Sequence, residues 1–67
     1  MAAYRSYCFA PTGGIMTVDA SDQVDDEAAS RWGAELLARS GACSAVEVWE
    51  LSRRVCRHER ERAPSRA

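Results

Sequence analysis

Lysine is absent from this sequence of 67 residues, so all nine of its Lys-or-Arg positions are arginines. Ten acidic side chains leave a formal net charge of −1 at pH 7. A chain so close to neutral has no general electrostatic attraction for nucleic acid or for an anionic membrane surface. Arginine also suits bidentate contacts with carboxylates and phosphates, so the position of each arginine carries more information than the total charge.

Long apolar stretches are missing as well. No run approaches the roughly 20 apolar residues of a membrane-spanning helix. The first residues, MAAYRSYCFAPTGG, lack the basic flank and the continuous apolar stretch of a secretory signal. We therefore expect a cytoplasmic protein without a membrane partner.

Cysteine and histidine are scarce. Three cysteines, Cys8, Cys43 and Cys56, cannot all pair within one chain, and their spacing matches no small secreted framework. We therefore expect reduced thiols. Closely spaced cysteine pairs of the C-x-x-C type are absent, and His58 is the only histidine, so we predict no structural metal, no cofactor and no Cys-His catalysis.

The chain length allows one domain with a small core. A domain of this size hides only about 60% of the surface that its unfolded chain exposes, so a lone copy is marginally stable and oligomerisation is a natural remedy. The final residues carry no apolar side chain larger than Ala or Pro. We predict a single domain over residues 1–58 and a disordered charged tail over 59–67.

The pattern of apolar and turn-forming residues predicts four strands and one helix. Aromatic residues at 4–9 precede the turn formers of 11–14, and β-branched residues follow over about 14–20, which is typical of a hairpin. Residues 45–51 and 54–57 form the other two strand candidates, joined by a turn at Ser52-Arg53.

The clearest signal is a helix over residues 25–41. Asp25 is placed to cap the first turn, and Val24 can pack against Ala29 as a hydrophobic staple. At the other end, Gly41 can adopt the left-handed conformation that closes a helix, and Arg39 complements the negative end of the dipole.

Together these elements predict an α+β fold of ββαββ order. A helix of this length can lie across a four-stranded antiparallel sheet, and pairing the first strand with the third at the centre gives the order 2-1-3-4. We place under the helix the alternate residues that supply the most apolar volume. These are Tyr7, Phe9, Val46, Val48 and Val55, packed against Trp32, Leu36 and Leu37.

The same assignment leaves the other sheet face without a cover. We expect Tyr4, Cys8, Trp49 and Leu51 on that face, and an exposed patch of this kind indicates a partner. Arginines follow in the chain, and Arg53, Arg54 and Arg57 next to aromatic residues could contact nucleic acid. Interleaved glutamates would repel phosphate, which favours a solvated charged edge.

The combination of Tyr4-Arg5 with Tyr7 and Phe9, the Gly-containing turn, the acidic helix start at 25–29, and Val46-Glu47-Val48-Trp49 followed by Arg54-Val55 resembles a known group. It looks like the short stand-alone bacterial proteins of unknown function that are common in alphaproteobacteria. The resemblance covers most of residues 4–57 and implies the ββαββ fold and a cytoplasmic location. It implies no activity and no site residue.

Three functional hypotheses follow. The leading one is a non-enzymatic interaction or regulatory module that forms a homodimer through the uncovered sheet face. The second is a small nucleic-acid-binding protein that uses the arginine and aromatic residues. The third is a thiol- or metal-responsive protein.

Overall fold

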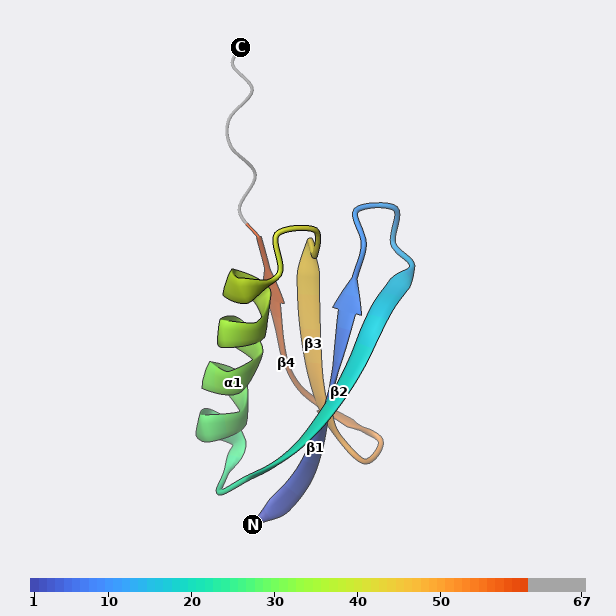
Figure 1. The fold of residues 1–67 in the computed structure, drawn as a ribbon. Coiled ribbons are helices and arrows are strands. Elements are labelled where there is room, and N and C mark those ends of the chain that lie inside the picture. Colours follow the sequence, from blue (N-terminus) through green and yellow to red (C-terminus); the bar gives the residue numbers. More distant parts are fainter. Residues whose placement is uncertain (61–67) are drawn as a thin grey trace.

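A computed structural model describes residues 1–60 and has the predicted ββαββ order (Figure 1). One four-stranded sheet has the order β2-β1-β3-β4, and all three strand pairs are antiparallel, as predicted. The elements are β1 (Ala2–Phe9), β2 (Ile15–Gln23), α1 (Asp26–Arg39), β3 (Ala45–Glu50) and β4 (Arg53–Glu59).

The β1–β2 hairpin is longer than the sequence pattern predicts. Its turn is closed by two backbone hydrogen bonds, from Ala10 N–H to Gly14 O at 2.7 Å and from Gly13 N–H to Ala10 O at 2.8 Å. Gly13 has φ 98°, a conformation that glycine adopts without steric cost. Beyond the turn, β2 pairs with β1 as far as Ala2 and Gln23, so the polar residues after Val18 continue the strand. Backbone hydrogen bonds to β1 hold this part of β2 in the sheet. Most β2 side chains are exposed, so the strand does not need an apolar pattern.

Helix α1 begins as predicted. Asp25 is the N-cap, and its Oδ1 accepts a hydrogen bond from Ala28 N–H at 2.9 Å, while Asp26 and Glu27 place negative charge in the first turn. The hydrophobic staple is not formed, because Val24 is exposed.

The predicted closure by Gly41 is wrong. The helix ends at Arg39, Ser40 is an extended C-cap that donates its N–H to Leu36 O, and Gly41 does not have a positive φ. Carbonyl oxygens in the last turn of the helix and just after it accept hydrogen bonds from Arg60 instead. Arg60 donates from its guanidinium to Leu37 O, Ser40 O and Cys43 O.

Arg60 also changes the predicted domain boundary. Glu59 belongs to β4, and Arg60 N–H donates to Ser44 O at 2.8 Å, so these two residues are part of the ordered domain and not of a tail. The rest of the predicted tail, residues 61–67, lies outside the described residues.

The assignment of the two β1 faces is also wrong. The side chains of Tyr4, Ser6 and Cys8 lie under α1 and are buried, whereas Tyr7 and Phe9 point away from the helix and are half-buried. Val46 and Val48 are buried under the helix, as predicted, and Val55 packs against the same core. Cross-strand pairing of Ser6 with Val48 and of Cys8 with Val46 explains the result, because directly opposed residues share one face.

Helix α1 packs mainly on β3 and β4 and leaves β2 at the far side of the sheet (Figure 1). The helix approaches β3 closely at Gly33, where an added Cβ would stand 2.6 Å from Val48 Cγ2. The glycine therefore allows the helix backbone to approach β3. Within residues 1–60, α1 is the single helix, and it is neither long nor apolar enough to cross a membrane.

Candidate functional site: the open face of the sheet

The sheet face turned away from α1, here called the open face, carries an aromatic row beside a charged cluster. Pairing places Val18 opposite Tyr7 and Ile15 opposite Phe9, and it places Tyr7 opposite Glu47. The β2 side chains on this face are exposed, 57% for Ile15 and 53% for Val18. The open face includes Arg5, Tyr7, Phe9, Ile15, Val18, Asp22, Glu47, Trp49, Arg54, Arg57 and Glu59.

The structure divides the four predicted interface residues: Trp49 and Leu51 line one hollow, whereas Tyr4 and Cys8 lie in the core. Tyr4 is 2% exposed and Cys8 is 8% exposed, so both belong to the core on the helix side. Trp49 lies on the open face, as predicted, where its cross-strand partners are Arg5 and Arg54 and its indole N–H donates to Glu47. Leu51 is outside the strands, in the β3–β4 turn, where it is 93% exposed with φ 56°.

Glu47 organises the charged part of the open face. Its carboxylate accepts a hydrogen bond from Trp49 Nε1–H at 2.9 Å and further ones from Arg57 and Arg54, and its side chain is 13% exposed. Burial alone would raise the pKa of Glu47, but the hydrogen bonds from Trp49 and Arg57 and the nearby arginine charges outweigh it and lower the pKa. Glu47 is therefore an ionised carboxylate held by three donors.

Arg57 links the charged and aromatic parts. Its guanidinium carbon lies 5.5 Å from the centroid of the Phe9 ring, and its Nε also donates to Glu59 at 2.8 Å. A cation over an aromatic face is attracted by the ring quadrupole. Next to this cluster is a shallow hollow of about 380 Å³ lined by Tyr7, Phe9, Ile15, Glu47, Trp49 and Leu51.

Arg53, the third arginine proposed for nucleic acid, lies in a separate cluster at the start of the helix. Asp26 accepts two hydrogen bonds from Arg53, at 3.0 and 3.1 Å, and one from the Tyr4 hydroxyl at 2.8 Å. The hydrogen bonds from Arg53 and Tyr4 lower the pKa of Asp26, and the hydrogen bond to Asp26 together with burial raises the pKa of Tyr4 to about 12. Glu50 also accepts from Arg53.

Two of the three cysteines are joined. Cys8 and Cys43 form a disulfide with Cα atoms 6.0 Å apart, whereas Cys56 is free and half-buried. The expectation of three reduced thiols is therefore wrong for this pair. The fold brings the two residues together because the end of β1, which contains Cys8, lies next to the helix-to-β3 connection, which contains Cys43. The spacing of the cysteines in the sequence does not indicate this proximity.

His58, the single histidine, lies on the helix side of β4. It lies half-buried beneath α1, and its Nε2 is 2.9 Å from Ser30 O and 3.5 Å from Cys56 Sγ. A carbonyl oxygen only accepts, so Nε2 carries a proton and donates to Ser30 O. Because Nε2 already carries this proton, it cannot accept one from Cys56. The hydrogen bond from His58 to Ser30 O joins β4 to the helix.

No three His, Cys, Asp or Glu side chains within residues 1–60 are grouped to hold a metal ion. Comparison of the chain with protein-family models, curated proteins and solved structures finds no match. The resemblance to short alphaproteobacterial proteins stays a prediction, and so do the absence of enzymatic activity and a thiol-responsive role.

Proposed function

We propose that this protein is a non-enzymatic interaction module that forms a homodimer through its open face. The observation that carries the proposal is the row of half-buried aromatic side chains beside exposed Ile15 and Val18, on a face that the single described helix does not cover. Apolar surface in water is unfavourable by about 25 cal/mol per Å², so a partner that covers it stabilises so small a domain.

A second copy is the occupant that the charge distribution favours. Within residues 1–60, the open face carries three arginines, Arg5, Arg54 and Arg57, and three carboxylates, Asp22, Glu47 and Glu59, so it offers little net charge to select a strongly charged partner. In a two-fold dimer the apolar patch of one copy would pack against the same patch of the other copy. The β2 side chains are mostly exposed, so the second copy can reach them. Trp49 is the kind of aromatic residue that contributes much of the binding energy in such an interface.

The nucleic-acid hypothesis has less support from the same geometry. All three arginines proposed for that role bind carboxylates, Arg53 to Asp26 and Glu50, and Arg54 and Arg57 to Glu47. A phosphate backbone would have to compete with these carboxylates for each guanidinium.

Location stays a prediction within this proposal. A cytoplasmic setting normally keeps thiols reduced, whereas the Cys8–Cys43 disulfide favours an oxidising environment or a redox-linked role. Counting the free thiols of protein trapped with an alkylating reagent inside the expressing cell decides between the two settings.

The test of the proposal is a matched pair of substitutions on neighbouring β2 residues. Val18→Asp places a charge on the open face, and Thr17→Asp places the same charge on the opposite face of the strand; both residues are exposed. We expect a dimer at micromolar concentration by sedimentation equilibrium, weakened at least about tenfold by Val18→Asp and by Trp49→Glu but not by Thr17→Asp. A monomeric wild type at high concentration, or equal effects of both β2 variants, contradicts the proposal.

Fluorescence anisotropy of a labelled single-stranded oligonucleotide, titrated with the protein, tests the nucleic-acid hypothesis. A bound complex whose affinity falls steeply with salt would replace the dimer proposal by the nucleic-acid hypothesis.

A further inference from the structure

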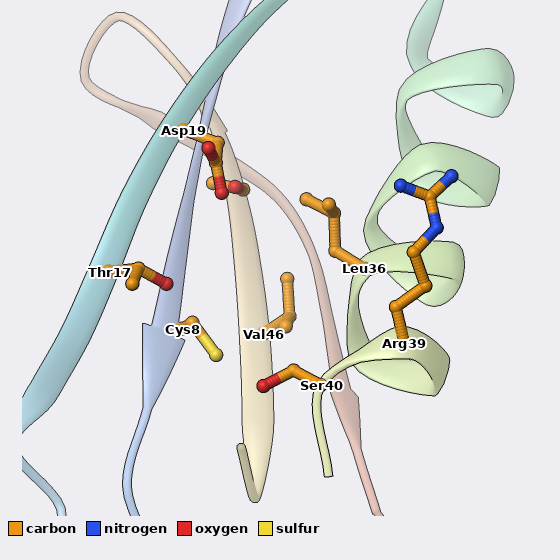
Figure 2. A pocket seen from close by; sticks show the side chains of 8 residues that line it. Cys8, Thr17, Asp19, Leu36, Arg39, Ser40 and Val46 are labelled. Atoms are coloured by element: carbon orange, nitrogen blue, oxygen red, sulfur yellow. The ribbon is translucent and has the colours of Figure 1, made fainter. Parts of the chain in front are cut away.

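A second hollow lies on the helix side of the sheet, independent of the open face. Because α1 packs mainly on β3 and β4, a groove remains between its C-terminal half and β2 (Figure 2). The groove has a volume of about 170 Å³. Its lining residues are Ser6, Cys8, Thr17, Asp19, Leu36, Arg39, Ser40 and Val46.

On the β1 and β2 side of the groove, one carboxylate lies beside two hydroxyls that can accept hydrogen bonds. Asp19 and Thr17 project from β2 on the same side as Ser6, which is the cross-strand partner of Asp19. Among the ion pairs found within residues 1–60, none involves Asp19. Its carboxylate is therefore available to a cationic ligand.

Arg39, the one arginine that lines the groove, does not pair with Asp19. In Figure 2 the Arg39 side chain runs along the helix on the far side of Leu36 from Asp19. Its guanidinium pairs with Glu35 on the same helix at 3.8 Å. The apolar part of the groove, Leu36 and Val46, therefore lies between this arginine and the carboxylate.

Ser6 provides a second, independent sign of a ligand. The residue is 2% exposed, yet its hydroxyl takes part in none of the side-chain hydrogen bonds found among residues 1–60. No fully buried side-chain nitrogen or oxygen in this range lacks a partner, so the Ser6 hydroxyl must reach the groove that it lines. A nearly buried hydroxyl of this kind takes its hydrogen-bond partner from the groove, either a water or a ligand group.

We propose that this groove binds a primary alkylammonium group. The ammonium donates to Asp19, Ser6 and Thr17, and its methylene stem lies on Leu36 and Val46. Cavities of about 150 Å³ can hold benzene, so a groove of about 170 Å³ has room for a ligand of about the size of a lysine side chain or of butylammonium. An ammonium has three donors, which match a carboxylate and two hydroxyls.

The source of the ammonium is outside this chain's own side chains. The sequence contains no lysine, so a second copy cannot supply a lysine side chain to the groove. The ligand is a free amine or a lysine of a different protein. This inference does not depend on the proposed dimer, since the groove and the open face lie on opposite sides of the sheet.

The test is a titration followed by amide chemical shifts at neutral pH, where an alkylamine is protonated. The probes are n-butylammonium, n-butanol as its neutral isostere, and Nα-acetyl-lysine amide as the peptide form. The variants are Asp19→Asn and Ser6→Ala, with Asp22→Asn as the control, because Asp22 is on the other face of the same strand.

We expect saturable shifts around the groove with n-butylammonium and none with n-butanol. Asp19→Asn should weaken binding at least about tenfold, Ser6→Ala a few-fold, and Asp22→Asn not at all. Tighter binding of the lysine amide would identify a partner's lysine as the source, and exclusive binding of the amine would identify a free amine. Equal shifts with n-butanol, or unchanged binding by the Asp19→Asn variant, would overturn the proposal.

Discussion

The face of the sheet beneath α1 and the open face satisfy their polar groups in different ways. Under the helix, outside the groove that Ser6 and Asp19 line, polar side chains bind backbone, as where His58 donates to Ser30 O, or a single carboxylate, as where Tyr4 donates to Asp26. On the open face, Glu47 collects three donors from neighbouring strand side chains. The covered face therefore depends on close packing, whereas the open face depends on charge pairing and has apolar surface left over.

The largest expected effect concerns the bond that closes the covered face. The disulfide joins residues 35 apart in sequence, and in the chain-entropy description a closed loop of this length contributes roughly 3–4 kcal/mol to stability. Reductant should therefore lower the free energy of unfolding by about that amount, measured by urea denaturation. Alkylation in denaturant without reductant should find one thiol, Cys56, and Cys56→Ser should respond to reductant as the wild type does. Three reactive thiols would contradict the pairing.

The next effect tests how tightly the helix approaches the sheet. Gly33→Ala gains about 1 kcal/mol of helix propensity but places Cβ 2.6 Å from Val48 Cγ2, so we expect a net loss of about 1–2 kcal/mol in the urea midpoint analysis. Gly41→Ala is the control, because nothing lies within 4 Å of its Cβ position. Adding Val48→Ala to Gly33→Ala should cost less than the sum of the single changes. A neutral Gly33→Ala would show that the helix can shift away from β3.

The open face makes a comparable, pH-dependent contribution through Glu47. Its pKa is lowered by folding, so the stability it adds is complete above the unfolded value of 4.5 and is lost as the pH falls through the folded value. Glu47→Gln should cost about 1–2 kcal/mol at pH 7 and progressively less in acid, measured by thermal melts over pH 3–7. Glu35→Gln, which breaks only the exposed pair with Arg39, should change stability by a few tenths of a kcal/mol. A pH-independent Glu47→Gln effect would contradict this assignment.

The smallest effect has the opposite sign and concerns the turn between β3 and β4. Leu51 has φ 56° and is 93% exposed, so Leu51→Gly should relieve backbone strain without loss of packing and stabilise the domain by up to about 1 kcal/mol. Ser52→Gly is the control, because Ser52 does not have a positive φ and glycine there only adds unfolded-state entropy. A destabilised Leu51→Gly that also dissociates more readily would show that Leu51 is part of the dimer interface.

Local sequence determined the number, order and type of the elements and the start of the helix. Those features depend on signals within a few residues of one another, such as the Asp25 cap and the Gly13 turn. The order β2-β1-β3-β4 could be predicted because the helix length matches the strand lengths and few connections are possible. Trp49 was placed on the open face correctly by strand alternation from Val46 and Val48.

Only the tertiary structure decided which β1 face meets the helix and what closes the helix end. Both β1 faces contain an aromatic residue, so apolar volume alone favoured Tyr7 and Phe9. Pairing with β3 puts Ser6 and Cys8 on the same side as Val48 and Val46, and Tyr4 reaches the helix start to bind Asp26. Likewise Arg60, Cys8 and Cys43 act on groups far away in the sequence, because strand register brings them together, and no local pattern contains that register.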